Sequence, residues 1–271
     1  MSQATLPAQE TQLGADDVQA IDRLGDTYTR LREELARVIV GQDEVIERLA
    51  ICLFARGHAL LMGAPPKTQA AMLEAMQERR VTAIGKPFVL DAPFLVLATQ
   101  NPVEQEGTYP LPEAQLDRFM FLIELDYPSE AEEIQIARTT TGDELPELKH
   151  LLNAEQIIDY QDLVRRVPVP DHIYAYAARL VRKTRPHGET APEWLKPLVS
   201  WGAGPRAVQS LILGARARAA LSGSYMVRQE DIEHVAFPVL THRLITSFAA
   251  QAEGISAKEI VRRLVAETNE E

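Results

Sequence analysis

Three short stretches of the chain are apolar throughout and are predicted to be buried strands. They are residues 58–63 (HALLMG), 94–101 (FLVLATQN) and 119–126 (FMFLIELD). A strand with one solvent-facing side alternates apolar and polar residues, whereas a strand of a parallel sheet is covered on both faces and shows no alternation. The three runs therefore predict the parallel sheet of an α/β domain.

The segments around these runs read as helices and one hairpin. Residues 68–80 (TQAAMLEAMQERR) have a helical pattern, and residues 81–93 alternate around Gly85 as the two arms of a β-hairpin do. Upstream, residues 16–36 carry apolar side chains at helical spacing. Residues 37–57 predict a short extended turn, a break at Gly41 and a second helix.

From Tyr127 onward the pattern indicates helices only. Ser129 and Glu132 have the spacing of a capping box. Further helix starts are indicated by Asn153, Asp171, Pro205 and Ser256. We therefore predict a flexible tail over residues 1–15, an α/β core over residues 16–127, and a domain of five or six helices over residues 128–271.

Composition narrows the class of protein. The 271 residues carry a net charge of −11, which argues against general binding to nucleic acid. The single cysteine, Cys52, lies in an apolar stretch and reads as a small buried side chain, and it excludes an intrachain disulfide. The acidic N-terminus is unlike a signal peptide, and no apolar run reaches the about 18 residues of a membrane span. We expect a cytoplasmic protein.

The segment after the first strand resembles a phosphate-binding loop but does not satisfy its pattern. A P-loop reads G-x-x-x-x-G-K-[ST], and its glycines let backbone N–H groups surround the phosphates. Here Gly63 is followed by Ala-Pro-Pro-Lys-Thr, so the second glycine is missing and two prolines remove N–H donors. We do not expect Lys67 to bind phosphate. No apolar strand ends in a carboxylate pair that could hold Mg²⁺.

The predicted sheet is also too small for a domain of this kind. Each parallel β-α-β unit requires about 30 residues or more, and only three core strands are visible. If nothing paired beyond the strand at 94–101, its apolar edge would be exposed. The pattern alone therefore indicates that strands are missing.

Three blocks of the sequence resemble the MoxR family of AAA+ ATPases. They are VIVGQDEVIERL, ATQNPVEQEGTYPLPEAQLDRF and GAGPRAVQSLILGARARA, and the resemblance extends from about residue 37 to the C-terminus. It implies a core sheet of strand order 5-1-4-3-2 followed by a helical lid domain. The visible strands would be 1, 4 and 5, with strands 2 and 3 absent.

The resemblance also explains the incomplete loop. Family members have a complete Walker A loop, then a Walker B strand ending in Asp-Glu, and only later a segment like APPKTQ. This sequence passes from one to the other within GAPP (residues 63–66). Three explanations stay open: a segment missing from this sequence, an engineered deletion, or a naturally degenerate ATPase.

Two site residues come from the core. By resemblance, Asn101 at the end of a strand is sensor 1, which orients the attacking water. Ligands of α/β sheets do bind at the carboxyl ends of strands, although Asn101 could instead cap a turn. Arg118 would be the arginine finger, which acts on the nucleotide of a neighbouring subunit. The alternative is a surface ion pair of Arg118 with Asp117 or Glu113.

Arg206 has a physical argument of its own. It follows Pro205 and therefore lies in the first turn of a helix, where a cation opposes the helix dipole. A bound anion would reverse that effect, since the helix N-terminus and the guanidinium would both attract it. By resemblance Arg206 is sensor 2, which ties the helical domain to the phosphates of the nucleotide.

Three further positions are implied to bind nucleotide. Val40 and Gly41 resemble the segment that lies over the adenine, although a simple turn between a strand and a helix fits them equally. Gly63 would begin the phosphate loop. The six histidines show no zinc-binding spacing, so we expect no metal held by protein side chains alone.

The leading hypothesis is an AAA+ ATPase that binds ATP, ADP and Mg²⁺ at the interfaces of a homo-oligomeric ring, as a hexamer. The resemblance implies partners with von Willebrand factor A domains, and chaperone-like remodelling or metal insertion. The alternative is a non-catalytic assembly module that keeps the fold without Walker motifs. A DNA-dependent remodeller with a winged-helix C-terminus is a third reading, which the acidic balance opposes.

Overall fold

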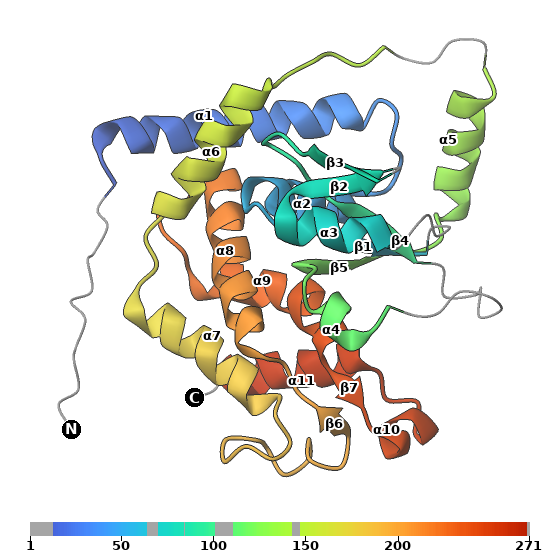
Figure 1. Cartoon of the computed structure of the whole chain (residues 1–271), viewed down its shortest axis with the longest axis vertical. Helices are drawn as coiled ribbons and strands as arrows, with labels where there is room; N and C mark the ends of the chain where they lie inside the picture. Colours follow the sequence, from blue (N-terminus) through green and yellow to red (C-terminus); the bar gives the residue numbers. More distant parts are fainter. Residues whose placement is uncertain (1–12, 64–69, 84, 101–110, 143–146, 270–271) are drawn as a thin grey trace.

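The structure of the chain is a computed structural model. It describes residues 13–63, 70–83, 85–100, 111–142 and 147–269 (Figure 1). The predicted tail, the GAPPKT segment and Asn101 lie wholly or mostly outside these ranges. Within them, no helix combines the length and apolarity that crossing a bilayer requires.

The first half of the chain contains a small parallel sheet. Its three strands are β1 (Ala59–Met62), β4 (Leu97–Gln100) and β5 (Phe121–Glu124). All pairs are parallel, and the spatial order is β4-β1-β5. The three predicted strands and their adjacency are therefore confirmed. Within the described part of the chain, β4 is paired along one edge only.

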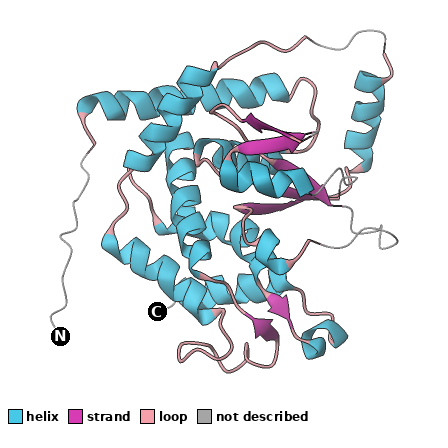
Figure 2. Ribbon diagram, in the orientation of Figure 1, coloured by secondary structure: helices cyan, strands magenta, loops and turns pink. Residues whose placement is uncertain are grey.

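Helices and a hairpin surround this sheet in the first half (Figures 1 and 2). The hairpin predicted around Gly85 is confirmed as the antiparallel pair β2 (Arg80–Ala83) and β3 (Lys86–Val89). The helices are α1 (Ala15–Leu35), α2 (Asp43–Phe54), α3 (Ala70–Glu78) and the short α4 (Glu113–Leu116).

The two faces of the sheet are covered by different helices, as expected for strands without alternation. One face packs against α2 and α9 and belongs to the main hydrophobic cluster, to which Ala59, Phe121 and Ile123 contribute. The other face belongs to a smaller cluster with Met72 and Met76 of α3 and Leu116 of α4; its strand residues are Leu60, Ala98 and Leu122. Successive residues of one strand thus serve opposite faces.

After β5 the chain is mainly helical, as predicted. Its helices are α5 (Glu130–Thr140), α6 (Ala154–Arg166), α7 (Asp171–Lys183), α8 (Pro205–Leu221), α9 (Gln229–Leu240), the 3₁₀ turn η1 (Thr241–Arg243), α10 (Phe248–Ala252) and α11 (Ala257–Asn269). The Ser129–Glu132 capping box is present, and Asn153 accepts from the Gln156 amide at 2.8 Å. Pro205 is the first residue of α8.

The prediction of helices alone in this half is wrong in one detail. The segments β6 (Val199–Trp201) and β7 (Ile245–Thr246) form a two-stranded antiparallel sheet. Strands of two or three residues are too short to show a period-2 pattern, which needs at least four residues to be recognised.

The two halves share one core. The main cluster joins buried residues of α1, α2, β1 and β5 to residues of α6, α7, α8, α9 and α11. Helix α1 lies across α6 and packs against α8 (Figure 1). Cys52 is fully buried in this cluster, and burial raises the pKa of its thiol. The domain boundary near Tyr127 stays a prediction. The segments on its two sides share extensive apolar contact.

A half-buried ion pair also joins the halves. His234 Nε2 of α9 lies 3.3 Å from Glu47 Oε2 of α2. The hydrogen bond from His234 is the main cause that lowers the pKa of the Glu47 carboxyl, and it outweighs the opposing effect of burial. A carboxyl with a lowered pKa in the folded state stabilises the fold above its unfolded pKa, and this contribution is lost as the pH falls through the lowered value.

We therefore predict that Glu47→Gln lowers the free energy of unfolding by about 1 kcal/mol at pH 6, typical of a partly exposed pair. The difference from the unmodified chain should shrink as the pH falls below about 4.5, because the unfolded carboxyl then takes up a proton first, and it should vanish once the pH is below the lowered pKa of the native carboxyl. Urea unfolding at pH 6, and at the lowest pH where both chains still unfold cooperatively, measures this. Glu33→Gln, an exposed change on α1, is the control. A deficit that does not depend on pH would contradict the prediction.

Candidate functional site

The predicted site residues lie at two opposite edges of the parallel sheet. Gly63 follows β1 and lies at the carboxyl edge, whereas Arg118 precedes β5 and lies at the amino edge. At about 3.3 Å per residue, the five steps from His58 to Gly63 span about 16 Å. The structure brings Arg118 and Arg206 together at the amino edge, and it does not bring either of them to Gly63 of the same chain.

Gly63 occupies a position that favours glycine at the carboxyl edge. Its φ angle is +113°, and a Cβ there would lie 2.9 Å from the carbonyl oxygen of Leu125. Its amide donates to the Gln100 carbonyl at 2.9 Å, which extends the pairing of β1 with β4. The neighbouring strand ends therefore approach closely here. Asn101, which follows Gln100, lies outside the described residues.

Val40 and Gly41 lie just before α2. Gly41 has a φ angle of +72°, and a Cβ there would collide with the carboxylate of Glu132. Because Glu132 belongs to the first turn of α5, which follows β5, this segment lies on the side of the carboxyl edge. The positive φ angle accounts for the glycine without a ligand, and the role over adenine stays a prediction.

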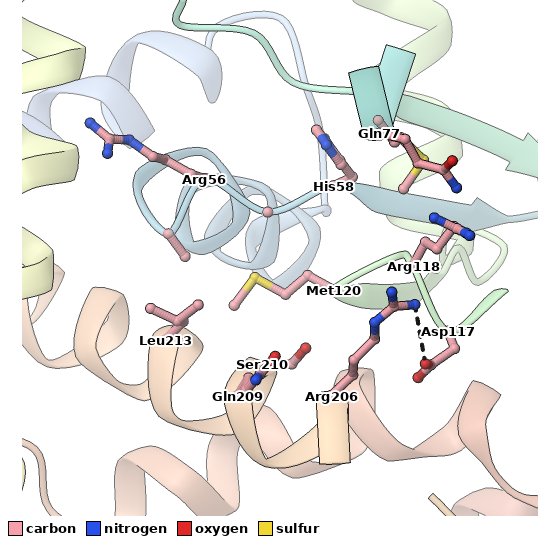
Figure 3. A pocket seen from close by; sticks show the side chains of 13 residues that line it. Arg56, His58, Gln77, Asp117, Arg118, Met120, Arg206, Gln209, Ser210 and Leu213 are labelled. Carbon is pink, nitrogen blue, oxygen red and sulfur yellow. Dashed lines mark ion pairs between the residues drawn. The ribbon is translucent and has the colours of Figure 1, made fainter. Parts of the chain in front are cut away.

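A cavity of about 550 Å³ opens at the amino edge, between the sheet, α3 and α8 (Figure 3). Its volume lies within the range of ordinary ligand pockets. The side chains that line it come from the loop before β1, from α3, from the turn before β5 and from α8. The polar ones are Arg56, His58, Gln77, Asp117, Arg118, Arg206, Gln209 and Ser210.

Arg118 lies in the turn between α4 and β5 and reaches toward α3. With the amide oxygen of Gln77 facing the guanidinium, that oxygen accepts from Arg118 Nε at 2.9 Å and from Nη2 at 2.6 Å. Gln77 is exposed, and an amide is a neutral partner. The Gln77 amide therefore orients Arg118 without neutralising its charge.

Arg206 is the second residue of α8, as predicted, and its side chain is 53% exposed. Its Nη1 lies 3.6 Å from Asp117 Oδ2, and Figure 3 shows this pair beside Arg118. The first turn of α8 contains no acidic residue, so the charge of Arg206 there opposes the helix dipole by a few tenths of a kcal/mol. The Asp117 carboxylate offsets this effect.

The other basic side chains of the cavity are engaged or neutral. Arg56 turns toward α6, where it donates to Gln161 and Asp162 at 2.9 Å each. His58 Nδ1 accepts from the Val96 amide at 3.2 Å, so the ring proton is on Nε2. Burial, together with the charge of Arg79, lowers the pKa of His58. In the described cavity lining, Arg118 is thus the cation without a carboxylate partner, and the 53% exposed Arg206 shares the Asp117 carboxylate with Arg243.

Sequence reasoning missed Asp117 as the partner of Arg206, and also Gln77 and Arg243. Arg243 is 2% exposed and lies 2.9 Å from the second oxygen of Asp117. Burial lowers the pKa of Arg243, and the Asp117 carboxylate counteracts this. The signal in the sequence was a His-Arg pair one residue after the apolar run FPVL, where a buried cation requires a partner.

The family described as "ATPase family associated with various cellular activities (AAA)" matches residues 60–121, and the family "AAA lid domain" matches residues 192–264. A crystal structure of a candidate ATPase from Cytophaga hutchinsonii superposes with a TM-score of 0.85 and 29% identity, over 92% of this chain and 96% of that one. The fold is therefore that of an AAA ATPase with a helical lid.

Curated relatives define the family more closely. Chaperone MoxR1 of Mycobacterium tuberculosis is 32% identical, over 88% of this chain and 81% of its own length. YeaC of Bacillus subtilis is 41% identical over 74% and 60% of the two lengths, and Protein MoxR of Methylorubrum extorquens is 26% identical over 81% and 88%. The chain belongs to the MoxR family of AAA+ ATPases, and this membership implies nucleotide binding.

The alignment with Chaperone MoxR1 is longer than the part of this chain that it covers. It runs over 306 positions, whereas 88% of a 271-residue chain is only about 238 residues. About 68 aligned positions therefore have no residue of this chain opposite them. The sequence also contains no complete phosphate loop. The residues present consequently do not form the whole of an ATP·Mg²⁺ site.

The loop before α8 determines where Arg206 lies. The amide of Ala203 donates to the buried hydroxyl of Thr184 at 2.9 Å, and Arg185 Nε donates to the Ala203 carbonyl at 3.0 Å. A Cβ on Gly202 would collide with the Thr184 carbonyl, whereas a Cβ on Gly204 would meet open space. Close backbone packing at Gly202 therefore fixes the start of α8.

We predict that Gly202→Ala lowers the free energy of unfolding by about 1–3 kcal/mol, the range for overpacking a tight site. Gly204→Ser is the matched control, because serine is favoured at a helix N-cap, and its effect should stay within about 0.5 kcal/mol. Urea unfolding of both variants measures the difference. Equal effects of the two substitutions would show that the contact with Thr184 does not constrain the loop.

Proposed function

We propose that the complete polypeptide hydrolyses ATP as a subunit of a ring, and that Arg118 and Arg206 both act on the nucleotide of the neighbouring subunit. The observation that carries this proposal is the position of the two arginines. They line one cavity at the amino edge together with His58, which lies about 16 Å from Gly63 along β1. A phosphate near Gly63 of the same chain is therefore out of their reach, and a second copy has to supply it.

This arrangement modifies the expectation for Arg206. The resemblance implies that Arg206 ties the helical domain to a nucleotide. The place of Arg206 in the sequence does not say which subunit holds that nucleotide. Because Asp117 pairs with Arg206 and precedes Arg118 in the chain, the two guanidinium groups form one surface. In phosphoryl transfer, an arginine supplied by a neighbour stabilises charge that develops in the transition state. We infer that Arg206 assists Arg118 in this role.

We propose that an absent block of about 68 residues carries the Walker A and Walker B motifs. Two independent observations support this. The alignment with Chaperone MoxR1 leaves that number of positions unmatched, and β4 has an unpaired edge among the described residues, where strands 2 and 3 would add. The block would supply the phosphate-binding lysine and the carboxylates for Mg²⁺, which this sequence lacks.

The work done by hydrolysis is inferred from the family. One relative is named a chaperone, which supports remodelling of client proteins or assistance in metal insertion. A hexameric ring, clients with von Willebrand factor A domains and a cytoplasmic location stay predictions from the sequence. The alternative, a non-catalytic assembly module, is favoured if the 271 residues are the whole polypeptide, because then no residue holds the metal.

Intact-mass spectrometry and nucleotide binding test the missing block. We expect a polypeptide about 7–8 kDa heavier than 30.2 kDa, at about 111 Da per residue, and binding of ATP when Mg²⁺ is present. The 271-residue chain alone should bind ATP much more weakly, because it lacks the phosphate loop. A mass of 30.2 kDa together with no nucleotide affinity would instead favour the assembly module.

A mixing experiment tests action on the neighbouring subunit. Arg118→Ala in the complete polypeptide should lower kcat by about 10³-fold, the lower end for an arginine supplied by a neighbour. The 271-residue chain keeps Arg118 but has no phosphate loop, so adding it should restore activity in mixed rings. The 271-residue chain with Arg118→Ala is the matched control and should restore nothing.

The contradicting outcome is also specific. If native mass spectrometry shows mixed rings and activity is still not restored, Arg118 acts within its own chain or has no catalytic role. Arg165→Ala removes an exposed arginine of α6 and should leave kcat unchanged.

A further inference from the structure

A buried arginine of the lid donates hydrogen bonds to the turn that carries Arg118. Arg243 belongs to η1, yet its guanidinium enters the turn between α4 and β5 and contacts backbone carbonyls there. Its Nη2 donates to Phe119 O at 2.7 Å and to Asp117 O at 3.1 Å, and its Nη1 donates to Met120 O at 3.2 Å. Three of the four carbonyls between residues 117 and 120 are thus held by one side chain.

The same guanidinium also holds the side chain of Asp117. Arg243 Nε donates to Asp117 Oδ1 at 2.9 Å, while Asp117 Oδ2 faces Arg206 at 3.6 Å. One carboxylate is therefore shared between a buried arginine and an exposed one. The Asp117 carboxylate therefore links Arg243 to Arg206. The carbonyls of Asp117 and Phe119, on either side of Arg118 in the chain, link Arg243 to the backbone at Arg118.

Further polar contacts with α8 and α9 hold the Arg243 side chain in place. Nη1 donates to the Val239 carbonyl of α9, and Nη2 lies 3.4 Å from the hydroxyl of Ser210 on α8. The neighbouring His242 is half-buried, and its Nε2 donates to Phe119 O at 3.1 Å. A guanidinium has five N–H donors in a fixed plane, whereas the ammonium of lysine has three donors at one point.

We infer that Arg243 is a positioning residue, which sets the Arg118 turn and the Asp117–Arg206 pair in the geometry that a phosphate of the neighbouring subunit requires. This inference rests on the proposed function. Arg243 itself touches no reacting atom, since it is buried behind the turn. The simpler alternative is that Arg243 only attaches the lid to the sheet, and the two roles differ in what a substitution changes.

Native-state hydrogen exchange on the 271-residue chain separates the two roles. The amides of Arg118 and Phe119 donate within the turn, and the amide of Met120 donates to the His58 carbonyl at 2.8 Å. In Arg243→Lys, these amides should exchange at least about tenfold faster than in the unmodified chain, since hydrogen bonds to a charged group contribute about 1.5–3 kcal/mol each. The amides of Leu163 and Val164, buried in α6, should change much less.

The controls keep the test decisive. Arg165→Lys makes the same chemical change at an exposed site and should alter neither set of amides. Asp117→Asn leaves Arg243 in place and, if Arg243→Lys folds poorly, provides the second variant; it should loosen the turn in the same way. If the turn amides and the α6 amides accelerate by the same factor, Arg243 only holds the lid and the inference is overturned.

Kinetics of the complete polypeptide give the second readout. Arg243→Lys should lower kcat with KM for ATP unchanged, and in a polypeptide that already carries both Arg118→Ala and Arg206→Ala it should lower kcat no further. Additive losses would overturn the inference, because a positioning residue acts only through the group it positions. If the unmodified polypeptide shows no ATPase activity, the proposed function fails, while the exchange experiment still decides whether Arg243 orders the turn.

Discussion

The direction of the three parallel strands determines what one copy of this protein can do. All three run the same way, so every carboxyl end lies at one edge and every amino end at the other. Gly63 lies at the first edge and Arg118 at the second. A polypeptide cannot bend a buried strand to bring these together, since the strand is fixed by pairing and by packing on both faces. In the proposed function, a second copy therefore has to supply the phosphates that the arginines contact.

The lid is placed by burial rather than by a ligand. Helix α8 packs against the sheet so closely that a Cβ on Gly214 would lie 3.2 Å from the ring of Phe121. Its start is fixed by the Gly202–Thr184 contact, and its partner turn is held by Arg243. Apolar packing therefore sets the coarse position of Arg206, and a buried guanidinium sets the fine position. A movement of the lid and a movement of the Arg118 turn are coupled through these contacts.

Much of the fold could be predicted from local patterns. The unalternating runs gave the three strands, and local start signals such as Asn153 and Pro205 gave helix boundaries. Strand adjacency came from the family resemblance. The short strands β6 and β7 and the five-residue α10 were missed, because such elements are fixed by tertiary contacts rather than by periodicity.

The site was less accessible to sequence reasoning. A first-turn arginine predicts attraction to an anion, but only the packing of α8 decides which edge of the sheet Arg206 faces. Asp117 and Arg243 are 126 residues apart in sequence, so no local pattern could pair them. The roles of Asn101, Val40 and Gly41 stay predictions.

A cryo-electron microscopy structure of the complete polypeptide, assembled with Mg²⁺ and a non-hydrolysable ATP analogue, tests the central claim most directly. The quantity to measure is which subunit's nucleotide lies within hydrogen-bond distance of the Arg118 and Arg206 guanidinium groups. We expect both to contact phosphates held by the adjacent subunit. Contacts of Arg206 with the nucleotide of its own subunit, or an assembly in which neither arginine faces a nucleotide, would contradict the account.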